Sequence, residues 1–174
     1  MHQRHRRKFY KSNTMTATDL HQALAPLTGQ LAGRPLDRAL DAWLNAEAGP
    51  GSATYAAITA ACMAGVAEGW LCNRHQQLDS GGIRYGRIFK PAPELDGFSV
   101  DVVDMENIAG PHHSHPNGEI DLLMPTEGDA LFDGRAAGWV VYPPGSAHRP
   151  TVSQGRALVL YLLPAGAIQF TPAA

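Results

Sequence analysis

The sequence has only two cysteines, no long hydrophobic run and no overall excess of positive charge. No stretch reaches about 18 apolar residues, which argues against a membrane-spanning helix and predicts no membrane partner. Hydrophobic residues make up 44% of the 174 positions, enough for one domain to bury a core. Cys62 and Cys72 fall in one expected helix, where a rise of about 15 Å keeps them too far apart for a disulfide. Two unpaired thiols are typical of a reducing compartment and predict a cytoplasmic protein.

Positive charge is confined to the start of the chain. Residues 1–15 carry five basic side chains and no acidic one, so the rest holds nine Lys and Arg against 16 Asp and Glu, a net charge of −7. Such a body binds polyanions poorly, and we expect no nucleic-acid partner. The basic start lacks the apolar run of a secretory signal, and we interpret it as a disordered tail rather than a nucleic-acid or membrane arm. Because Met15 opens a more ordinary amino terminus, residues 1–14 are alternatively a vector-derived or misassigned extension.

The first half of the chain has the periodicity of helices. Apolar residues recur at helical spacing over residues 18–31, 35–48 and 52–70. Pro35 suits the first position of the second helix, and Gly49-Pro50-Gly51 ends it. The third helix is rich in alanine, and we interpret its apolar stripe as core packing or as the surface of a homodimer. We assign residues 16–78 to a helical region.

After Asp79-Ser80-Gly81-Gly82 the pattern changes to short β-type runs. Five strands are expected, each bounded by Gly, Pro or Asp: Ile83–Lys90, Phe98–Met105, Glu119–Met124, Gly138–Tyr142 and Ala157–Leu163. Strands at regular turn spacing are typical of a sandwich or barrel of the jelly-roll type. The sequence therefore predicts an α+β fold, in which a helical region precedes a jelly-roll β-barrel over residues 79–174.

Three histidines and a carboxylate gather in two turn-flanked patches of the second half. His113 and His115 are two residues apart, so their side chains share one side of an extended segment. Glu119 follows a Pro-Asn-Gly turn, and His148 follows a Pro-Pro-Gly turn. A lone histidine is more often a core or surface residue, but this group predicts a site for a first-row metal. His112 would point the opposite way, so we treat it as a neighbour of the site.

The two patches resemble the two motifs of the cupin superfamily. His113-x-His115-x3-Glu119 is similar to the first motif, and Pro143-x-Gly145-x2-His148 is similar to the second. The resemblance implies a cupin-type β-barrel with a metal inside its open end. The implied ligands are His113, His115, Glu119 and His148.

A closer resemblance covers most of the chain. It is carried by His115-Pro-Asn-Gly-Glu-Ile-Asp-Leu, Phe132-Asp-Gly, Gly138-Trp, Pro144-Gly-Ser-x-His148-x-Pro-Thr and Leu160-Tyr-Leu-Leu-Pro-x-Gly. These segments are similar to the 4-hydroxylaminobenzoate lyase family, which joins a helical amino-terminal part to a cupin-like end. The resemblance implies a lyase of nitroaromatic degradation that converts 4-hydroxylaminobenzoate and water to protocatechuate and ammonia.

Such a reaction needs cleavage of an N–O bond and addition of water to the ring. An octahedral divalent ion on four protein ligands keeps two positions open, which favours Fe, Mn or Co over Zn as the cofactor. Asp121 follows Glu119 by two residues and shares its face of a strand, so both are candidate catalytic residues. Asp121 would act as a general acid/base or orient a ligand histidine, and the alternative is a solvated carboxylate at the strand end.

A small aromatic acid as substrate also calls for a cation and for apolar walls. Arg84 and Arg87 are three residues apart in one strand and therefore lie on opposite faces. We prefer Arg87 for the carboxylate because it would share a face with Tyr85 and Phe89. The candidate walls around the ring are Trp139, Tyr142 and Tyr161, with core packing as the alternative for each.

The same residues are compatible with three other hypotheses. A cupin dioxygenase or isomerase acting on a small acid would keep the metal, and oxygen dependence would separate it from a lyase. A non-catalytic cupin binding domain would hold a structural metal or none. A metal-free enzyme would use His113, His115 and His148 as direct acid/base groups.

Overall fold

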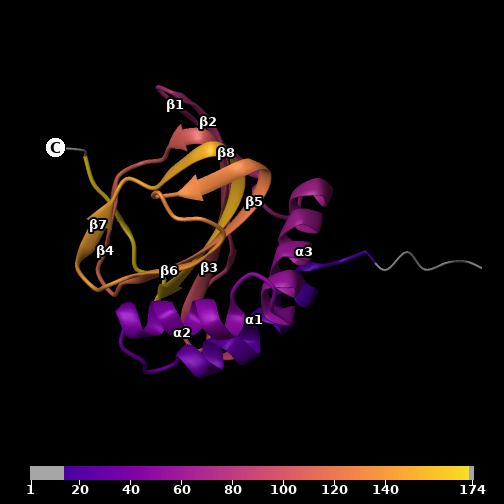
Figure 1. Cartoon of the computed structure of the whole chain (residues 1–174), viewed down its shortest axis with the longest axis vertical. Coiled ribbons are helices and arrows are strands. Elements are labelled where there is room, and N and C mark those ends of the chain that lie inside the picture. Colours follow the sequence, from indigo (N-terminus) through magenta and orange to yellow (C-terminus); the bar gives the residue numbers. More distant parts are fainter. Residues whose placement is uncertain (1–13, 173–174) are drawn as a thin grey trace, which may run out of the picture.

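The protein is described by a computed structural model over residues 14–172, where three helices precede nine strands (Figure 1). The predicted tail over residues 1–15 lies almost wholly outside the described residues. The helices are α1 Ala17–Leu31, α2 Arg38–Ala48 and α3 Ala53–Glu68, and a 3-10 turn spans Pro93–Leu95. The strands are β1 Arg74–Leu78, β2 Gly81–Phe89, β3 Phe98–Ala109, β4 His113–His115, β5 Glu119–Phe132, β6 Gly138–Tyr142, β7 Ser146–His148, β8 Thr151–Pro164 and β9 Gln169–Phe170.

Side-chain caps and a glycine set the limits of the helices. The Asp37 carboxylate accepts a hydrogen bond from the Leu40 N–H at 2.9 Å and so begins α2. Ser52 Oγ accepts one from the Tyr55 N–H at 3.1 Å and begins α3. Gly69 directly follows the last residue of α3, and its φ of +83° suits a residue without Cβ. None of the described helices is both long and apolar enough to cross a membrane.

The predicted helical region extends too far, because α3 ends at Glu68 and Arg74–Leu78 forms strand β1. Cys72 therefore lies beyond α3 and not in one helix with Cys62, although both thiols are free and buried. The sequence of β1 has no apolar alternation, since β1 is an edge strand with largely exposed side chains. Backbone pairing with β2, rather than burial of side chains, makes this segment a strand.

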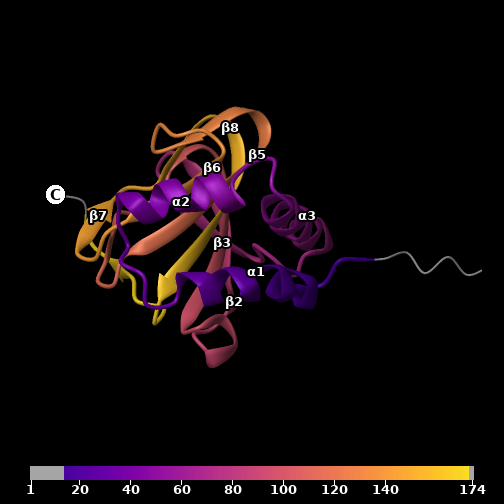
Figure 2. The same ribbon diagram turned by 60° about the horizontal axis from the view of Figure 1, so that its bottom comes forward.

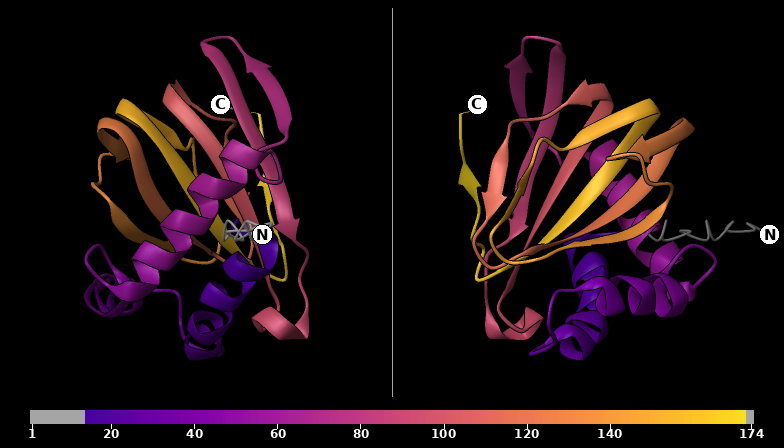
Figure 3. Two further views of the ribbon diagram at one scale, coloured as in Figure 1. Left: turned by 90° about the vertical axis from the view of Figure 1, so that its right-hand side faces the viewer. Right: turned by 60° about the vertical axis from the view of Figure 1, so that its left-hand side comes forward.

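The strands form two antiparallel sheets. The larger has the order β1-β2-β3-β8-β5-β6, and the smaller has the order β7-β4-β9. Figures 2 and 3 show the helices on the outer side of the larger sheet, with the smaller sheet on its other side. The five predicted strands are confirmed as β2, β3, β5, β6 and β8. The predicted α+β arrangement of helices followed by a β-sandwich is therefore confirmed.

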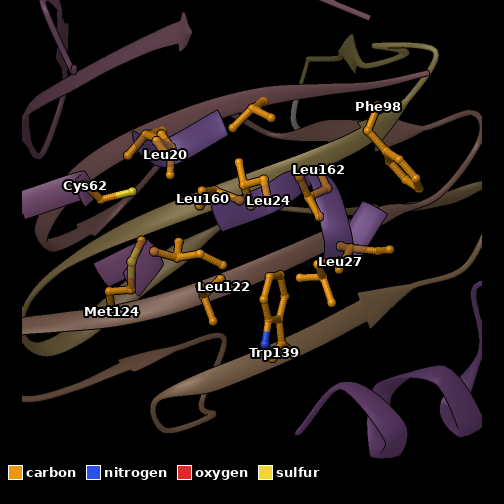
Figure 4. Packing of buried hydrophobic residues seen from close by; sticks show 14 of the residues in the cluster. Leu20, Leu24, Leu27, Cys62, Phe98, Leu122, Met124, Trp139, Leu160 and Leu162 are labelled. Atoms are coloured by element: carbon orange, nitrogen blue, oxygen red, sulfur yellow. The ribbon is translucent and has the colours of Figure 1, made fainter. Parts of the chain in front are cut away.

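The larger sheet is buried on both faces. Along β8, Leu158, Leu160 and Leu162 pack against the leucines of the helices. Figure 4 shows Leu160 and Leu162 beside Leu24 of α1. The alternate residues Val159, Tyr161 and Leu163 face the interior of the sandwich. The sequence of a strand that is buried on both faces is a continuous apolar run, and the second half of β8 has such a sequence.

Trp139 belongs to the core on the helix side. Its side chain is buried, and its Nε1–H donates to the Ala48 carbonyl oxygen at 2.8 Å. Figure 4 shows it in the same cluster as Leu27 and Leu122. Its prediction as a substrate wall is therefore wrong, because on β6 this residue faces α2 and not the interior of the sandwich.

Polar contacts fix α2 to the edge strand β6. The Arg135 guanidinium donates to both oxygens of Asp41 at 2.7 and 2.8 Å, and the Val141 N–H donates to Asp41 at 3.0 Å. Asn45 accepts from the Trp139 N–H and donates to the Trp139 carbonyl, both at 2.8 Å. These side chains satisfy backbone groups that an edge strand would otherwise leave unpaired.

Candidate metal centre

Three histidines and one glutamate converge at one end of the sandwich interior. His113 and His115 come from β4, Glu119 opens β5, and His148 ends β7. His113 and His148 are cross-strand neighbours in the antiparallel β4–β7 pair. One candidate ligand atom from each of the four residues lies within 4.8 Å of the others. The structure thus brings together all four side chains that the sequence proposes as metal ligands.

The contacts within this cluster are short. Glu119 Oε2 lies 3.2 Å from both His113 Nε2 and His115 Nε2, and Glu119 Oε1 lies 3.4 Å from His148 Nε2. The Nε2 atoms of His113 and His148 are 3.1 Å apart. His113, His115 and Glu119 are buried, so solvent water does not screen the interactions between these polar atoms.

A glycine turn makes the close approach of Glu119 to the histidines possible. The Gly118 N–H donates to the His115 carbonyl at 3.2 Å, and the φ of Gly118 is +83°. A Cβ at this position would come within 2.5 Å of Leu36 Cδ2 and 2.8 Å of the Tyr142 carbonyl oxygen. The turn before Glu119 therefore requires glycine both for its backbone conformation and for space.

The outer hydrogen bonds decide which ring nitrogen of each histidine carries the proton. His113 Nδ1 lies 3.1 Å from the Pro111 carbonyl oxygen, which can only accept, so Nδ1 must be the donor. His115 Nδ1 lies 2.9 Å from Ser146 Oγ, whose own hydrogen goes to a backbone carbonyl. His148 Nδ1 lies 2.6 Å from Asp133 Oδ2. All three Nε2 atoms therefore present lone pairs to the centre of the cluster when the rings are neutral.

A cation at the centre resolves this arrangement. With neutral rings, three nitrogen lone pairs and a carboxylate face one another in a buried space. Within residues 14–172, His115 Nε2 and Glu119 Oε1 have no hydrogen-bond partner. Burial acts to raise the pKa of Glu119, but the contacts of its oxygens with the three histidine rings, when these are protonated at Nε2, hold it well below its usual value. The donor set of three imidazoles and one carboxylate fits a divalent first-row metal ion.

Asp133 is a functional candidate that the sequence analysis missed. Burial acts to raise its pKa, but hydrogen bonds from His148 and Tyr142 lower it, so it is a carboxylate at neutral pH. It accepts from His148 Nδ1, from the Tyr142 hydroxyl and from the Thr151 N–H. In the sequence this position was marked by the Asp-Gly turn signal and as part of the Phe132-Asp-Gly segment, neither of which indicated a role at the metal site. The carboxylate–histidine pair is the usual support of a metal-bound imidazole.

Asp121 is fully buried beside Glu119, on the interior face as predicted. Burial, followed by the charge of Glu119, raises its pKa well above the usual value of an aspartate. A neutral carboxyl group at this position can donate its proton to Glu119. The solvated strand-end carboxylate considered as an alternative is therefore wrong, because the side chain has no exposed surface.

A cavity of about 510 Å³ lies next to the cluster, between the two sheets. His113 and Tyr161 line it together with residues from β1, β2, β3 and β9. Asp121, Glu119 and Tyr142 are not among its lining residues. The Tyr142 ring instead lies 4.4 Å from the His148 ring, centroid to centroid. Among the candidate ligands, His113 is the one that lines this cavity.

The two candidate arginines lie in different surroundings. Arg87 lines the cavity together with Tyr85, as predicted. Phe89 does not share that face, because the register of β2 against β3 shifts between Arg87 and Phe89, and Phe89 packs on the helix side. Arg84 does not line the cavity and lies on the opposite face of β2, near Cys72. Its prediction as a substrate contact is therefore not supported by its position.

An antiparallel β-sandwich that carries a His-x-His-x3-Glu segment and a later histidine in one cluster defines a cupin. A family model for 4-hydroxylaminobenzoate lyase matches residues 22–170. The chain is 35% identical over 162 residues to the 4-hydroxylaminobenzoate lyase of Nocardioides sp. (strain LMS-CY), covering 89% of this chain and 95% of that one. It is 34% identical over 146 residues to the enzyme of that name from Pseudomonas putida, covering 75% and 82%. The chain belongs to the 4-hydroxylaminobenzoate lyase family.

Solved structures with a similar fold are more distant. The DMSP lyase DddQ from Ruegeria pomeroyi DSS-3 is 18% identical with a TM-score of 0.46, covering 90% of this chain and 98% of that one. A putative acetylacetone dioxygenase from Methylibium petroleiphilum PM1 is 18% identical with a TM-score of 0.42, covering 57% and 75%. Membership of the family makes the chain an enzyme of the lyase class, as predicted.

Proposed function

We propose that the protein converts 4-hydroxylaminobenzoate and water to protocatechuate and ammonia. The proposal rests on the position of His113. This residue belongs to the candidate metal cluster, and it also lines a cavity that is otherwise largely apolar. The aromatic ring of a substrate bound in that cavity would lie next to the cluster, and its hydroxylamine group would reach the end of the cavity at His113. The two relatives with this name support the substrate.

The overall reaction needs no external oxidant. The N–O bond of the hydroxylamine breaks and takes up an electron pair, while the ring gains oxygen and loses nitrogen, so oxidation and reduction balance within substrate and water. A divalent ion held by His113, His115, Glu119 and His148 would supply Lewis acidity toward the hydroxylamine oxygen or water. We propose Fe, Mn or Co, because four protein ligands already complete the usual coordination of Zn.

The side chains around the cluster have distinct roles in this proposal. Tyr161 lines the cavity, and burial raises the pKa of its phenol well above the usual value, so it stays a hydroxyl donor at neutral pH. Asp121 does not line the cavity, and its position beside Glu119 suits orienting that carboxylate. Glu119 itself fixes the geometry of the three imidazoles.

The partners and the location follow from the composition and from α3. We propose a small aromatic acid as the substrate, no nucleic-acid or membrane partner, and a cytoplasmic location. A homodimer is proposed because the exposed side of α3 carries Met63 and several alanines, and such a face is favourably buried against a second copy.

The test of the reaction combines metal analysis with anaerobic turnover on one purified sample. Plasma mass spectrometry gives the metal content, and ammonia and protocatechuate are measured after addition of 4-hydroxylaminobenzoate without oxygen. Both products from a metal-loaded sample would support the lyase reaction. Absence of turnover from a fully loaded sample would contradict it, and turnover that requires oxygen would point to a dioxygenase.

A further inference from the structure

The cavity reaches the surface between the edge strands of the two sheets. β1 is the edge of the larger sheet and β9 is the edge of the smaller one. Arg74 and Gln76 of β1 and Phe170 of β9 all line the cavity, and all three are exposed. The mouth of the cavity therefore has a basic side chain on one lip and an aromatic ring on the other.

Arg87, the other arginine that lines the cavity, is already engaged. Its Nε and Nη2 atoms donate to the two oxygens of Asp101, both at 3.0 Å. Nη2 also donates to the Gly166 carbonyl oxygen at 3.3 Å, in the loop that leads from β8 to β9. The charge of Arg87 is thus balanced within the protein, and its side chain is used to hold the loop before Phe170.

Arg74 has no such counter-charge in the part of the chain that the structure describes. The register places it opposite Tyr85, and Tyr85 opposite Val103, so these three side chains form one row on the cavity side of the sheet. Among residues 14–172, no carboxylate forms an ion pair with Arg74. An uncompensated guanidinium at the mouth of an apolar cavity favours an anionic group of a ligand.

Phe170 supplies the second observation. It is 66% exposed, the more exposed of the two large hydrophobic side chains at the surface of the described part of the chain. Its ring centroid lies 5.7 Å from that of His113. An aromatic side chain left exposed beside a candidate metal ligand is covered when an apolar ring enters the cavity.

We infer that Arg74 binds the carboxylate of the substrate while Phe170 packs against its ring, so that the opposite end of the substrate points toward His113. This inference rests on the proposed function, and it makes Arg74 the residue that selects aromatic acids over uncharged aromatics. Arg87 holds the cavity wall and does not contact the carboxylate.

The test compares protocatechuate with catechol, which lacks only the carboxylate, by calorimetric titration of the metal-loaded protein. We expect the wild type to bind protocatechuate more tightly, and Arg74→Met to reduce this preference by about 10- to 100-fold. Arg84→Met is the matched control, since it removes an arginine from the far face of the same hairpin and should leave the preference unchanged. Phe170→Ala should weaken both ligands by a similar factor.

Turnover of 4-hydroxylaminobenzoate by the same variants separates this inference from the proposed function. Arg74→Met should raise KM by about the same factor with little change in kcat, because the carboxylate contact is equal in the ground and transition states. If the wild type shows no turnover but Arg74→Met still removes the preference for protocatechuate, the proposed function fails and the inference stands. The inference that Arg74 binds the carboxylate would be overturned if Arg74→Met kept the wild-type preference for protocatechuate over catechol. It would also be overturned if only Arg87→Met lost that preference, or if the wild type showed no preference.

Discussion

His148 Nδ1 lies 2.6 Å from Asp133 Oδ2, although His148 ends β7 and Asp133 lies in the turn that follows β5. This contact assigns the proton of the ring to Nδ1 and leaves Nε2 directed at Glu119. Burial acts to lower the pKa of His148, but the hydrogen bonds and charges of Asp133 and Glu119 raise it to about 9. A metal ion that takes the place of the Nε2 proton satisfies the same two carboxylates.

Asp133→Asn is expected to weaken metal binding by about 10- to 100-fold, because an amide no longer supplies the charge that supports the metal-bound imidazole. Competition with a chromophoric chelator measures the dissociation constant. Asp129→Asn changes an exposed aspartate of β5 for which no side-chain partner is found in the described chain, and it should behave as the wild type. Equal metal affinity in the two variants would show that the Asp133 carboxylate does not contribute to metal binding.

His113→Ala and His148→Ala are expected to lose bound metal, while His112→Ala should keep it. His112 contacts Thr171 at 2.5 Å and is not part of the cluster, so its imidazole is dispensable for coordination. Metal content after gel filtration should fall from about one ion per chain to near zero in the first two variants. A full complement of metal in His113→Ala would show that the ligand set is wrong.

Gly118→Ala is expected to destabilise the protein by about 2–4 kcal/mol, since it adds a clash with Leu36 and the Tyr142 carbonyl to an unfavourable φ. Gly134→Ala is the matched control, because its φ of +81° is similar but a Cβ there meets nothing within 4 Å. The Gly134→Ala substitution should lower the free energy of unfolding by only about 1 kcal/mol. Urea unfolding compares the two, and similar losses would show that the turn before Glu119 has room for a side chain.

Asp41→Asn is expected to lower the free energy of unfolding at pH 7 by about 1–3 kcal/mol, because it breaks the contact between α2 and Arg135. Burial acts to raise the pKa of Asp41, but the hydrogen bonds from Arg135 and Val141 lower it overall. A carboxylate with a lowered folded pKa contributes its stability above the unfolded value of 3.8 and loses it as the pH falls through the folded value.

The difference between wild type and Asp41→Asn should therefore narrow as the pH falls below 3.8. Urea unfolding at pH 7 and near pH 3 measures this change. Glu47→Gln, an exposed acid on the same helix, should show no comparable difference at either pH. A constant difference between wild type and Asp41→Asn across this range would exclude a contribution from the charge of Asp41.

Besides the predicted helical region, which extended over β1, the wrong predictions concern the side of a strand to which a residue points. Alternation correctly separated Arg84 from Arg87, but a shift in register moved Phe89 to the helix side. Trp139 is similarly in a correctly predicted strand and on the unexpected face. In a sheet buried on both sides, hydrophobicity does not distinguish the two faces, so only the packing of the helices decides between them.

By itself, the sequence determined the α+β arrangement, the five main strands and the four members of the His/Glu cluster, because these depend on periodicity and on short spacings around turns. Only the tertiary structure decided that Asp133 supports His148, that Asp101 neutralises Arg87, and that Arg74 and Phe170 meet at one cavity. Those relationships join segments that strand register and sheet packing bring together. Local propensity carries no information about them, since the distances involved are set by which strands pair.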